Sequence, residues 1–473
     1  MMNRITARCR DAVRRIRDRD RDRARARTLC PAVEGLEDRK LLSTANGGHW
    51  YYPIRITYSF MPDGTSIGGV PSNLFQSLNA IAPTTTWQDQ FRKAAAIWQQ
   101  VAGFNIVEVP DSGDPVGGVG NQQNDPRYGD IRIGGTPMSM GYLGYALLPP
   151  PINGGPDAGD IVMNTSQLWK INNDYDLLSV AIHEIGHSLG MGHSAIATAD
   201  MYSYYNGMKQ TLQSDDTSGI QYLYGPVPAD ATPNNVGLSS AIDLSSLIDP
   251  QGRVSYAFGY VTKLANPEYY KVTVPSTTTG TMTVTMQSSL LSSLTPRLSV
   301  VNSAQQTLGT VTGTGLYGAT ISFTVNNVVP GETYYLVAKA AKSGPGENGA
   351  FGLLINFGNS YLPPITPYDT TVAQQPDQGV NGWSPEMTPK DMRRPLRFLR
   401  NQMGPNQGDD TPDSQVIAIK LGDGQGVSYA DALLATPRRQ SSRFRQPLHP
   451  RQSSHLRQPL HATHPRPSRF RHA

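Results

Sequence analysis

The stretch HEIGHSLGMGH, residues 183–193, places three histidines and one glutamate at fixed spacing. On a helix, His183 and His187 are about one turn apart, so both imidazoles lie on one face with Cβ atoms about 5–6 Å apart. That separation suits two Zn–N bonds of about 2.0–2.1 Å. Glu184 is rotated off this face. It is therefore predicted to act as a general base toward a zinc-bound water rather than as a ligand.

The third ligand requires that the helix stop. A continuing helix would carry His193 away from the other two histidines, whereas Gly190 permits a positive-φ turn that swings His193 back. Three nitrogen ligands leave the fourth tetrahedral position open, which is typical of catalytic rather than structural zinc. The sequence thus predicts one catalytic Zn²⁺, held by His183, His187 and His193, with Glu184 as the catalytic residue.

The distribution of histidine supports a metal site over scattered core histidines. The chain has 9 histidines in 473 residues, and these three are the only ones between Trp50 and Leu448. Core histidines that merely fill hydrogen bonds have no reason to share one eleven-residue window.

The segment resembles the HExxHxxGxxH zinc site of the metzincin metallopeptidases. Ser194 and the run ADMYSYY, residues 199–205, are similar to the matrixin branch, the matrix-metalloproteinase family. The resemblance implies that Met201 forms the Met-turn beneath the zinc and that Tyr205 lines the substrate-specificity pocket. Ser203 stands where that family usually has proline.

The resemblance covers roughly residues 53–226 and implies an α+β metzincin-like catalytic domain. Leu143–Ala146 is similar to the edge strand that pairs with substrate, which assigns Leu143 and Ala146 to substrate binding; Tyr145 replaces the family's histidine. The apolar periodicity and the resemblance together predict strands at Ile54–Phe60, Asn105–Val109, Asp130–Ile133 and Ile161–Met163, and helices at Phe91–Val101, Asp176–Leu189 and Leu212–Gly225.

Three departures from the family matter. Animal matrixins hold a second, structural zinc through further histidines, which residues 50–226 do not supply. Asp157 and Asp160 lie in a glycine-rich loop, where the resemblance suggests Ca²⁺ and ordinary turn formation is the alternative. The family's cysteine-switch motif, which keeps the peptidase latent, is matched here only by the thiol of Cys30. The sequence therefore does not indicate how peptidase activity is restrained.

Beyond Pro226 the apolar period changes to two, which predicts an all-β sandwich domain. Its strands are expected at Tyr270–Val274, Met282–Met286, Leu298–Val300, Ile321–Val325, Tyr335–Ala338 and Leu353–Phe357. Residues 229–359 resemble the pre-peptidase C-terminal modules of bacterial secreted peptidases. Because Pro226, Pro228 and Pro233 break both periodicities, we expect few contacts to cross this linker.

The resulting organisation has four parts: a basic leader with an export-type segment (1–49), the peptidase domain (50–226), the sandwich (227–359) and a disordered low-complexity tail (360–473). The leader segment Leu36–Leu42 resembles the LEPR-XLL export segment, with Asp38 in place of proline, and a plain linker is the alternative. Residues 41–436 carry 19 basic and 30 acidic side chains. The overall charge of +4 therefore resides in basic ends and does not indicate a specific nucleic-acid-binding fold.

These features predict a zinc-dependent endopeptidase that hydrolyses peptide bonds in extracellular or surface proteins. No window approaches the roughly 18 apolar residues of a membrane span. The export-type segment and the resemblance to exported peptidases predict a secreted or cell-surface protein of bacterial origin. The alternative is an inert peptidase-like protein that binds a surface or matrix, although such a protein has no chemical need for Glu184.

Overall fold

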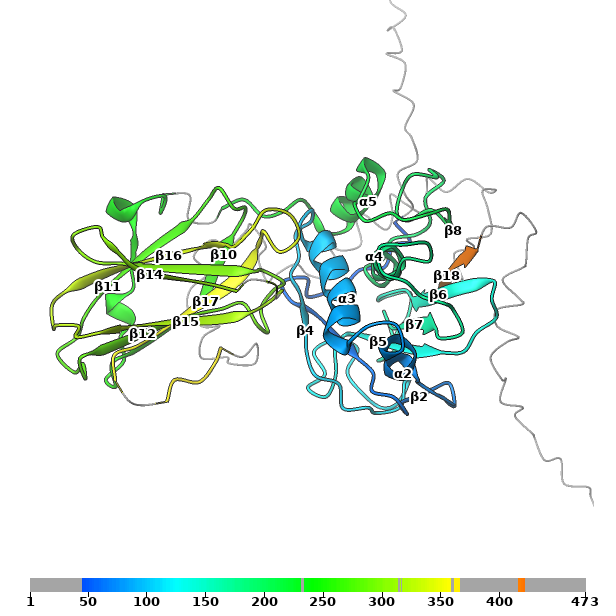
Figure 1. Cartoon of the computed structure of the whole chain (residues 1–473), viewed down its shortest axis with the longest axis horizontal. Helices are drawn as coiled ribbons and strands as arrows, with labels where there is room; N and C mark the ends of the chain where they lie inside the picture. Colours follow the sequence, from blue (N-terminus) through cyan, green and yellow to red (C-terminus); the bar gives the residue numbers. More distant parts are fainter. Residues whose placement is uncertain are drawn as a thin grey trace, which may run out of the picture.

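The computed structural model describes residues 45–230, 234–313, 315, 317–358, 361–365 and 416–421. Two regions with separate hydrophobic cores follow one another along the chain, an N-terminal region (residues 45–230) and a strand-rich region (residues 234–358) (Figure 1). The leader up to residue 44, with the export-type segment, lies outside the described residues.

A seven-stranded sheet organises the N-terminal region, in the order β4-β1-β5-β7-β6-β18-β8. Its strands are β1 (Ile56–Phe60), β4 (Ile106–Glu108), β5 (Ile131–Thr136), β6 (Tyr142–Leu147), β7 (Ile161–Asn164), β8 (Tyr204–Tyr205) and β18 (Val416–Leu421). Strands β4, β1, β5 and β7 are mutually parallel, and β6 runs antiparallel to β7. A small hairpin of β2 (Ser66–Ile67) and β3 (Val70–Pro71) stands apart from this sheet.

Four α-helices are described in this region: α2 (Leu74–Asn79), α3 (Thr84–Gln99), α4 (Leu177–Ser188) and α5 (Ser214–Tyr224). The helix predicted at Phe91–Val101 is present, but α3 begins seven residues earlier and ends two residues earlier, and it buries Trp87, Phe91 and Trp98 fully. Trp98 Nε1 donates a hydrogen bond of 2.8 Å to the carbonyl oxygen of Ile182, which joins α3 to α4. The mixed α/β content agrees with the predicted fold class, and the short elements α2, β2, β3 and β8 were not predicted.

The strand-rich region has two sheets around one shared core, in the orders β10-β17-β12-β15 and β14-β13-β16-β11-β9. Their strands are β9 (Ile242–Asp243), β10 (Arg253–Val261), β11 (Glu268–Thr273), β12 (Thr281–Gln287), β13 (Pro296–Val301), β14 (Thr307–Thr312), β15 (Thr320–Asn326), β16 (Thr333–Ala340) and β17 (Gly349–Asn356), with 3₁₀ turns at η1 (Leu238–Ser240) and η2 (Ser245–Leu247). Burial alternates along β11 and β16, as a period of two predicts. The sequence did not predict β10, whose pairing shifts register between Tyr256 and Gly259, or the largely exposed β14.

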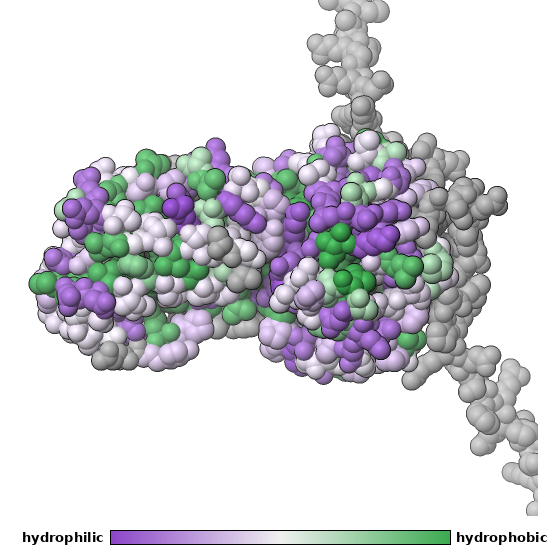
Figure 2. Space-filling model, in the orientation of Figure 1, coloured by the Kyte–Doolittle hydropathy of each residue, from purple (hydrophilic) through white to green (hydrophobic). Residues whose placement is uncertain are grey.

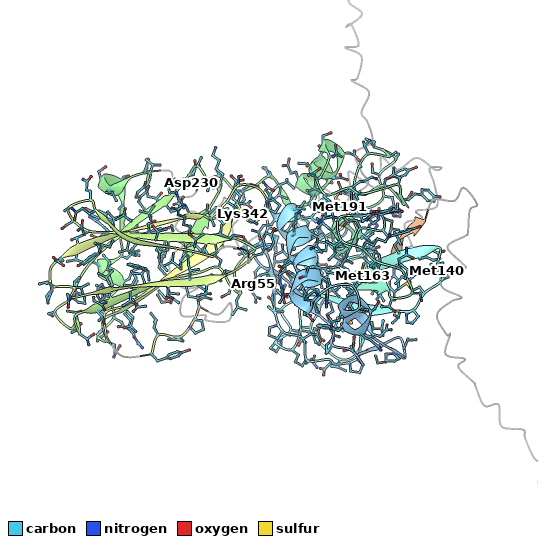
Figure 3. All side chains as sticks on the ribbon, viewed as in Figure 1. Arg55, Met140, Met163, Met191, Asp230 and Lys342 are labelled. Carbon is cyan, nitrogen blue, oxygen red and sulfur yellow. The ribbon has the colours of Figure 1, made fainter. Side chains whose placement is uncertain are left out.

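The two regions share a polar contact that the sequence analysis did not predict. Gln99 is fully buried; its Nε2 donates to Asn348 O at 2.6 Å, and its Oε1 accepts from the N–H of Ser293 at 3.1 Å. Ser293 Oγ donates to Ile106 O at 2.5 Å, and Arg55 Nε donates to the carbonyl oxygen of Leu290 at 2.6 Å. Figure 2 shows the molecule narrowing between the two regions, and Figure 3 labels Arg55 at this junction.

Two described pieces of the predicted disordered tail contribute to folded parts, which corrects that prediction for these residues. Ile365 is 4% exposed, and its backbone N–H and C=O both bond the side chain of Gln287 at 2.8 Å. The segment VIAIKL forms β18 within the N-terminal sheet, where Ile419 is also 4% exposed. The prediction of disorder rested on the average composition of residues 360–473, which is rich in Pro, Gly and Gln. Such an average does not reveal a single six-residue strand within the segment.

The contact at Gln99 leads to a stability prediction. Gln99→Met keeps a similar side-chain volume but leaves the buried groups of Asn348, Ser293 and Ile106 without their partner. We expect the free energy of unfolding of the full chain to fall by about 1–3 kcal/mol, measured by urea titration. Gln90→Met, on the same helix, is the control because Gln90 makes only a local bond to Thr86 O. Equal stability of the two variants would contradict an energetically coupled junction.

Candidate metal centre

Helix α4 carries the first two histidines and begins at a strong cap. The N-cap residue is Asp176, whose Oδ2 accepts from Ser179 N at 3.0 Å and from Ser179 Oγ at 2.7 Å. Every residue of α4 is buried, so the side chains of His183, Glu184 and His187 are shielded from bulk water. The predicted helix 176–189 is thus confirmed to within its capping residues.

The turn after α4 is glycine-dependent, as predicted. The helix ends at Ser188, and Gly190 has φ = 101°, a left-handed value that favours glycine. A Cβ at Gly190 would also overlap the carbonyl oxygen of Gly48. The turn brings His193 back, so that ligand atoms of His183, His187 and His193 all lie within 4.8 Å of one another.

The hydrogen bonds of the first two imidazoles prepare them for a cation. His183 Nδ1 lies 2.7 Å from Asp200 O, and His187 Nδ1 lies 2.8 Å from Met191 O. Since a carbonyl oxygen can only accept, each Nδ1 carries a proton, so the lone pair of the neutral ring belongs to Nε2.

These two lone pairs face each other, because His183 Nε2 and His187 Nε2 are 2.9 Å apart. Burial, together with the neighbouring His187 and His193, holds the pKa of His183 well below its usual value, which favours the neutral ring. Neutral Nε2 atoms so close to each other repel unless a cation lies between them. The three-histidine cluster therefore fits zinc, whose preferred ligands include neutral imidazole nitrogen.

Glu184 lies beside this cluster without joining it. Its side chain is fully buried, and a Cβ added at Gly144 of β6 would lie only 3.1 Å from Glu184 Oε1. Neither carboxylate oxygen has a well-formed hydrogen bond within the described part of the chain. Burial raises the pKa of Glu184 well above its usual value, while the nearby backbone N–H of Ile419 opposes that rise. Such a carboxylate is suited to taking up a proton.

The predicted Met-turn residue packs directly beneath α4. Met201 is fully buried, and its carbonyl oxygen accepts a 2.7 Å bond from Ser194 N, next to His193. A Cβ at Gly186 would overlap Met201 Sδ and would lie 2.8 Å from Trp98 Cζ2. The glycine between the two helical histidines thus lets the turn approach the helix.

The sequence analysis missed the residue that holds this turn. Asp216, in the first turn of α5, accepts from the backbone N–H groups of Asp200 at 2.9 Å and of Met201 at 3.1 Å. Asp200 in turn supplies the carbonyl oxygen that fixes His183. The only sequence signal was the acidic pair at the start of a predicted helix, which helix capping alone explains.

The predicted substrate-binding residues lie around the same helix. Leu143 and Ala146 are fully buried on β6, so their side chains belong to the core and only their backbones can face an added strand. Tyr205 accepts a 3.1 Å bond from Asp176 N and stacks on Tyr175 with ring centroids 5.8 Å apart. Tyr205 is therefore tied to the N-terminus of α4.

The predicted calcium loop has one clearly structural carboxylate. Asp160 is buried, and its Oδ1 accepts a 2.9 Å bond from Arg132 N. Within the described ranges, the three histidines form the only group of three or more His, Cys, Asp or Glu side chains close enough to share a metal. Calcium at Asp157 and Asp160 stays a prediction.

The contact between Gly186 and the Met-turn gives a second testable consequence. Gly186→Ala adds a Cβ where Met201 and Trp98 already pack, and overpacking of this kind costs about 1–3 kcal/mol. We expect a lower free energy of unfolding and weaker zinc binding, measured by denaturant titration and competition with a chelator. Gly154→Ala is the control, since nothing lies within 4 Å of a Cβ there. Wild-type zinc affinity in Gly186→Ala would contradict the supporting role of the turn.

Comparison with known proteins agrees with this geometry. The Matrixin family model matches residues 73–225. Karilysin of Tannerella forsythia is 35% identical over 147 residues, which cover 30% of this chain and 29% of karilysin. The hatching enzyme of Paracentrotus lividus is 33% identical over 190 residues (37% of this chain, 26% of that protein), and human matrix metalloproteinase-16 is 34% identical over 152 residues (28% and 23%).

The chain therefore spans less than a third of the length of each of these three relatives. The matched range includes all three histidines, Glu184 and Met201, and the three histidines lie close enough together to hold a metal ion. Residues 73–225 are a matrixin domain, and this similarity supports a zinc metalloendopeptidase.

Proposed function

We propose that this protein hydrolyses peptide bonds within other proteins, with zinc on His183, His187 and His193 and with Glu184 as the general base. One observation carries the proposal: two buried Nε2 atoms lie 2.9 Å apart with their Nδ1 atoms held by carbonyl oxygens. A buried carboxylate stands beside them without being a ligand. An inert binding protein would need neither arrangement.

The reaction divides between the metal and the protein. Zinc, when bound, supplies positive charge that polarises a peptide carbonyl and makes water more acidic. Glu184 takes a proton from the attacking water and then delivers it to the leaving amine nitrogen. Its burial favours this exchange, because a raised pKa lets the carboxyl group hold a proton between the two transfers.

Substrate would bind as an added strand. The edge of β6 that pairs with β18 carries backbone N–H and C=O groups, so an extended peptide in the place of β18 could continue the sheet there. Leu143 and Ala146 would contribute through their backbones, and Tyr205 would border the pocket for the side chain that follows the cut bond. Protein or peptide substrates are the partners this arrangement accommodates.

We also propose the organisation and location predicted from the sequence. The strand-rich region would be a β-sandwich module of the pre-peptidase type, attached to a peptidase domain over residues 50–226, and calcium would bind near Asp157 and Asp160. The resemblance of Leu36–Leu42 to an export segment supports a secreted or cell-surface bacterial protein. In the part of the chain that the structure describes, no helix has the length and apolar character needed to cross a membrane.

If Glu184 is a base and not a ligand, its loss should affect activity but not zinc binding. Glu184→Ala should retain one zinc per chain, measured by elemental analysis, yet lose casein hydrolysis by at least about 100-fold because the proton transfers lose their carrier. His187→Ala is the matched comparison and should lose both zinc and activity, since two nitrogens hold the ion less tightly than three. Loss of zinc from Glu184→Ala equal to that from His187→Ala would refute the assignment of a base.

A further inference from the structure

The edge of β6 already carries a strand from the far end of the same chain. Strand β18 runs antiparallel to β6 and parallel to β8, so it fills the position between them (Figure 1). The pairing joins Val416 to Leu147, Ala418 to Tyr145 and Lys420 to Tyr204. This is the place, and the added-strand mode, proposed above for a peptide substrate.

The register of β18 brings one peptide bond to the part of β6 that packs against Glu184. Ile419 pairs with Gly144, and a Cβ added at Gly144 would lie only 3.1 Å from Glu184 Oε1. The Ala418–Ile419 peptide bond therefore lies at the point of β6 where Gly144 packs against the carboxylate of the general base.

The side chain of Ile419 is also placed as a bound residue would be. It is 4% exposed and belongs to the core cluster that includes Leu143 and Ile182, against which Tyr205 packs. An apolar side chain thus enters the peptidase core directly after this peptide bond. A docked tail without a substrate role would not need this match of base, peptide bond and buried side chain.

We propose that β18 is an intramolecular substrate and that the protein cleaves its own chain between Ala418 and Ile419. This inference rests on the proposed peptidase function. Water adds to the carbonyl carbon of Ala418 while Glu184 accepts one of its protons, and the C–N bond then breaks as that proton passes to the nitrogen of Ile419. The products are a carboxylate on Ala418 and a fragment, residues 419–473, with Ile419 as its free amino terminus.

The test is incubation of the zinc-loaded full chain, with the fragments identified by intact mass and N-terminal sequencing. We expect a fragment that begins at Ile419, with a half-time unchanged by tenfold dilution, because strand and active site belong to one molecule. Glu184→Ala should leave the bond intact. Ile419→Asp should slow cleavage at this bond at least tenfold, whereas Leu433→Asp, the same kind of change outside β18, should not.

A second readout does not depend on catalysis. In full-length Glu184→Ala, backbone amides of β18 should be protected from hydrogen exchange, and adding Ile419→Asp should remove that protection while adding Leu433→Asp should not. Unprotected amides in Glu184→Ala would overturn the docking of β18.

The outcomes separate this inference from the proposed function. A zinc-loaded chain that cleaves casein but keeps the Ala418–Ile419 bond intact would overturn self-cleavage alone, even if removing β18 raised its activity. A half-time that lengthens in proportion to dilution would overturn the intramolecular route. A zinc-loaded chain that cleaves neither casein nor itself would contradict the proposed function.

Discussion

The orientation of two buried imidazoles is the constraint on which the site depends. Because Asp200 O and Met191 O each take an Nδ1 proton, the Nε2 atoms of His183 and His187 must face each other at 2.9 Å. Both carbonyl groups belong to segments that follow α4, so the loop after the helix is as necessary as the helix itself. A metal ion relieves the repulsion between the nitrogens, and its binding is therefore coupled to folding of this loop.

Several other contacts hold α4 and the loop that follows it. Asp216 on α5 holds the backbone of Asp200 and Met201, and the lack of a side chain at Gly186 lets Met201 pack under the helix. On the other side, Gly144 brings β6 against Glu184, which sets this carboxylate next to the edge of β6 that pairs with β18. Glu184 and the histidines thus contact different elements around one buried helix.

The sequence predicted the parts of this arrangement that are local. The three histidines, Glu184 and the ending of the helix at Gly190 lie within eleven residues, where helical spacing fixes their relation. It could not predict contacts between polar groups distant in the chain, such as Gln99 with Asn348 or Asp216 with Met201, because periodicity reports only apolar faces. It also missed β18, because a short apolar segment does not indicate which edge it joins.

X-ray absorption at the zinc edge of the metal-loaded full chain, compared with His193→Ala, tests the central claim most directly. The account predicts one zinc per chain whose spectrum contains three imidazole nitrogens, and one imidazole fewer, with weaker binding, in the variant. A wild-type spectrum with fewer than three imidazoles, or one unchanged in His193→Ala, would place the metal elsewhere and contradict the account.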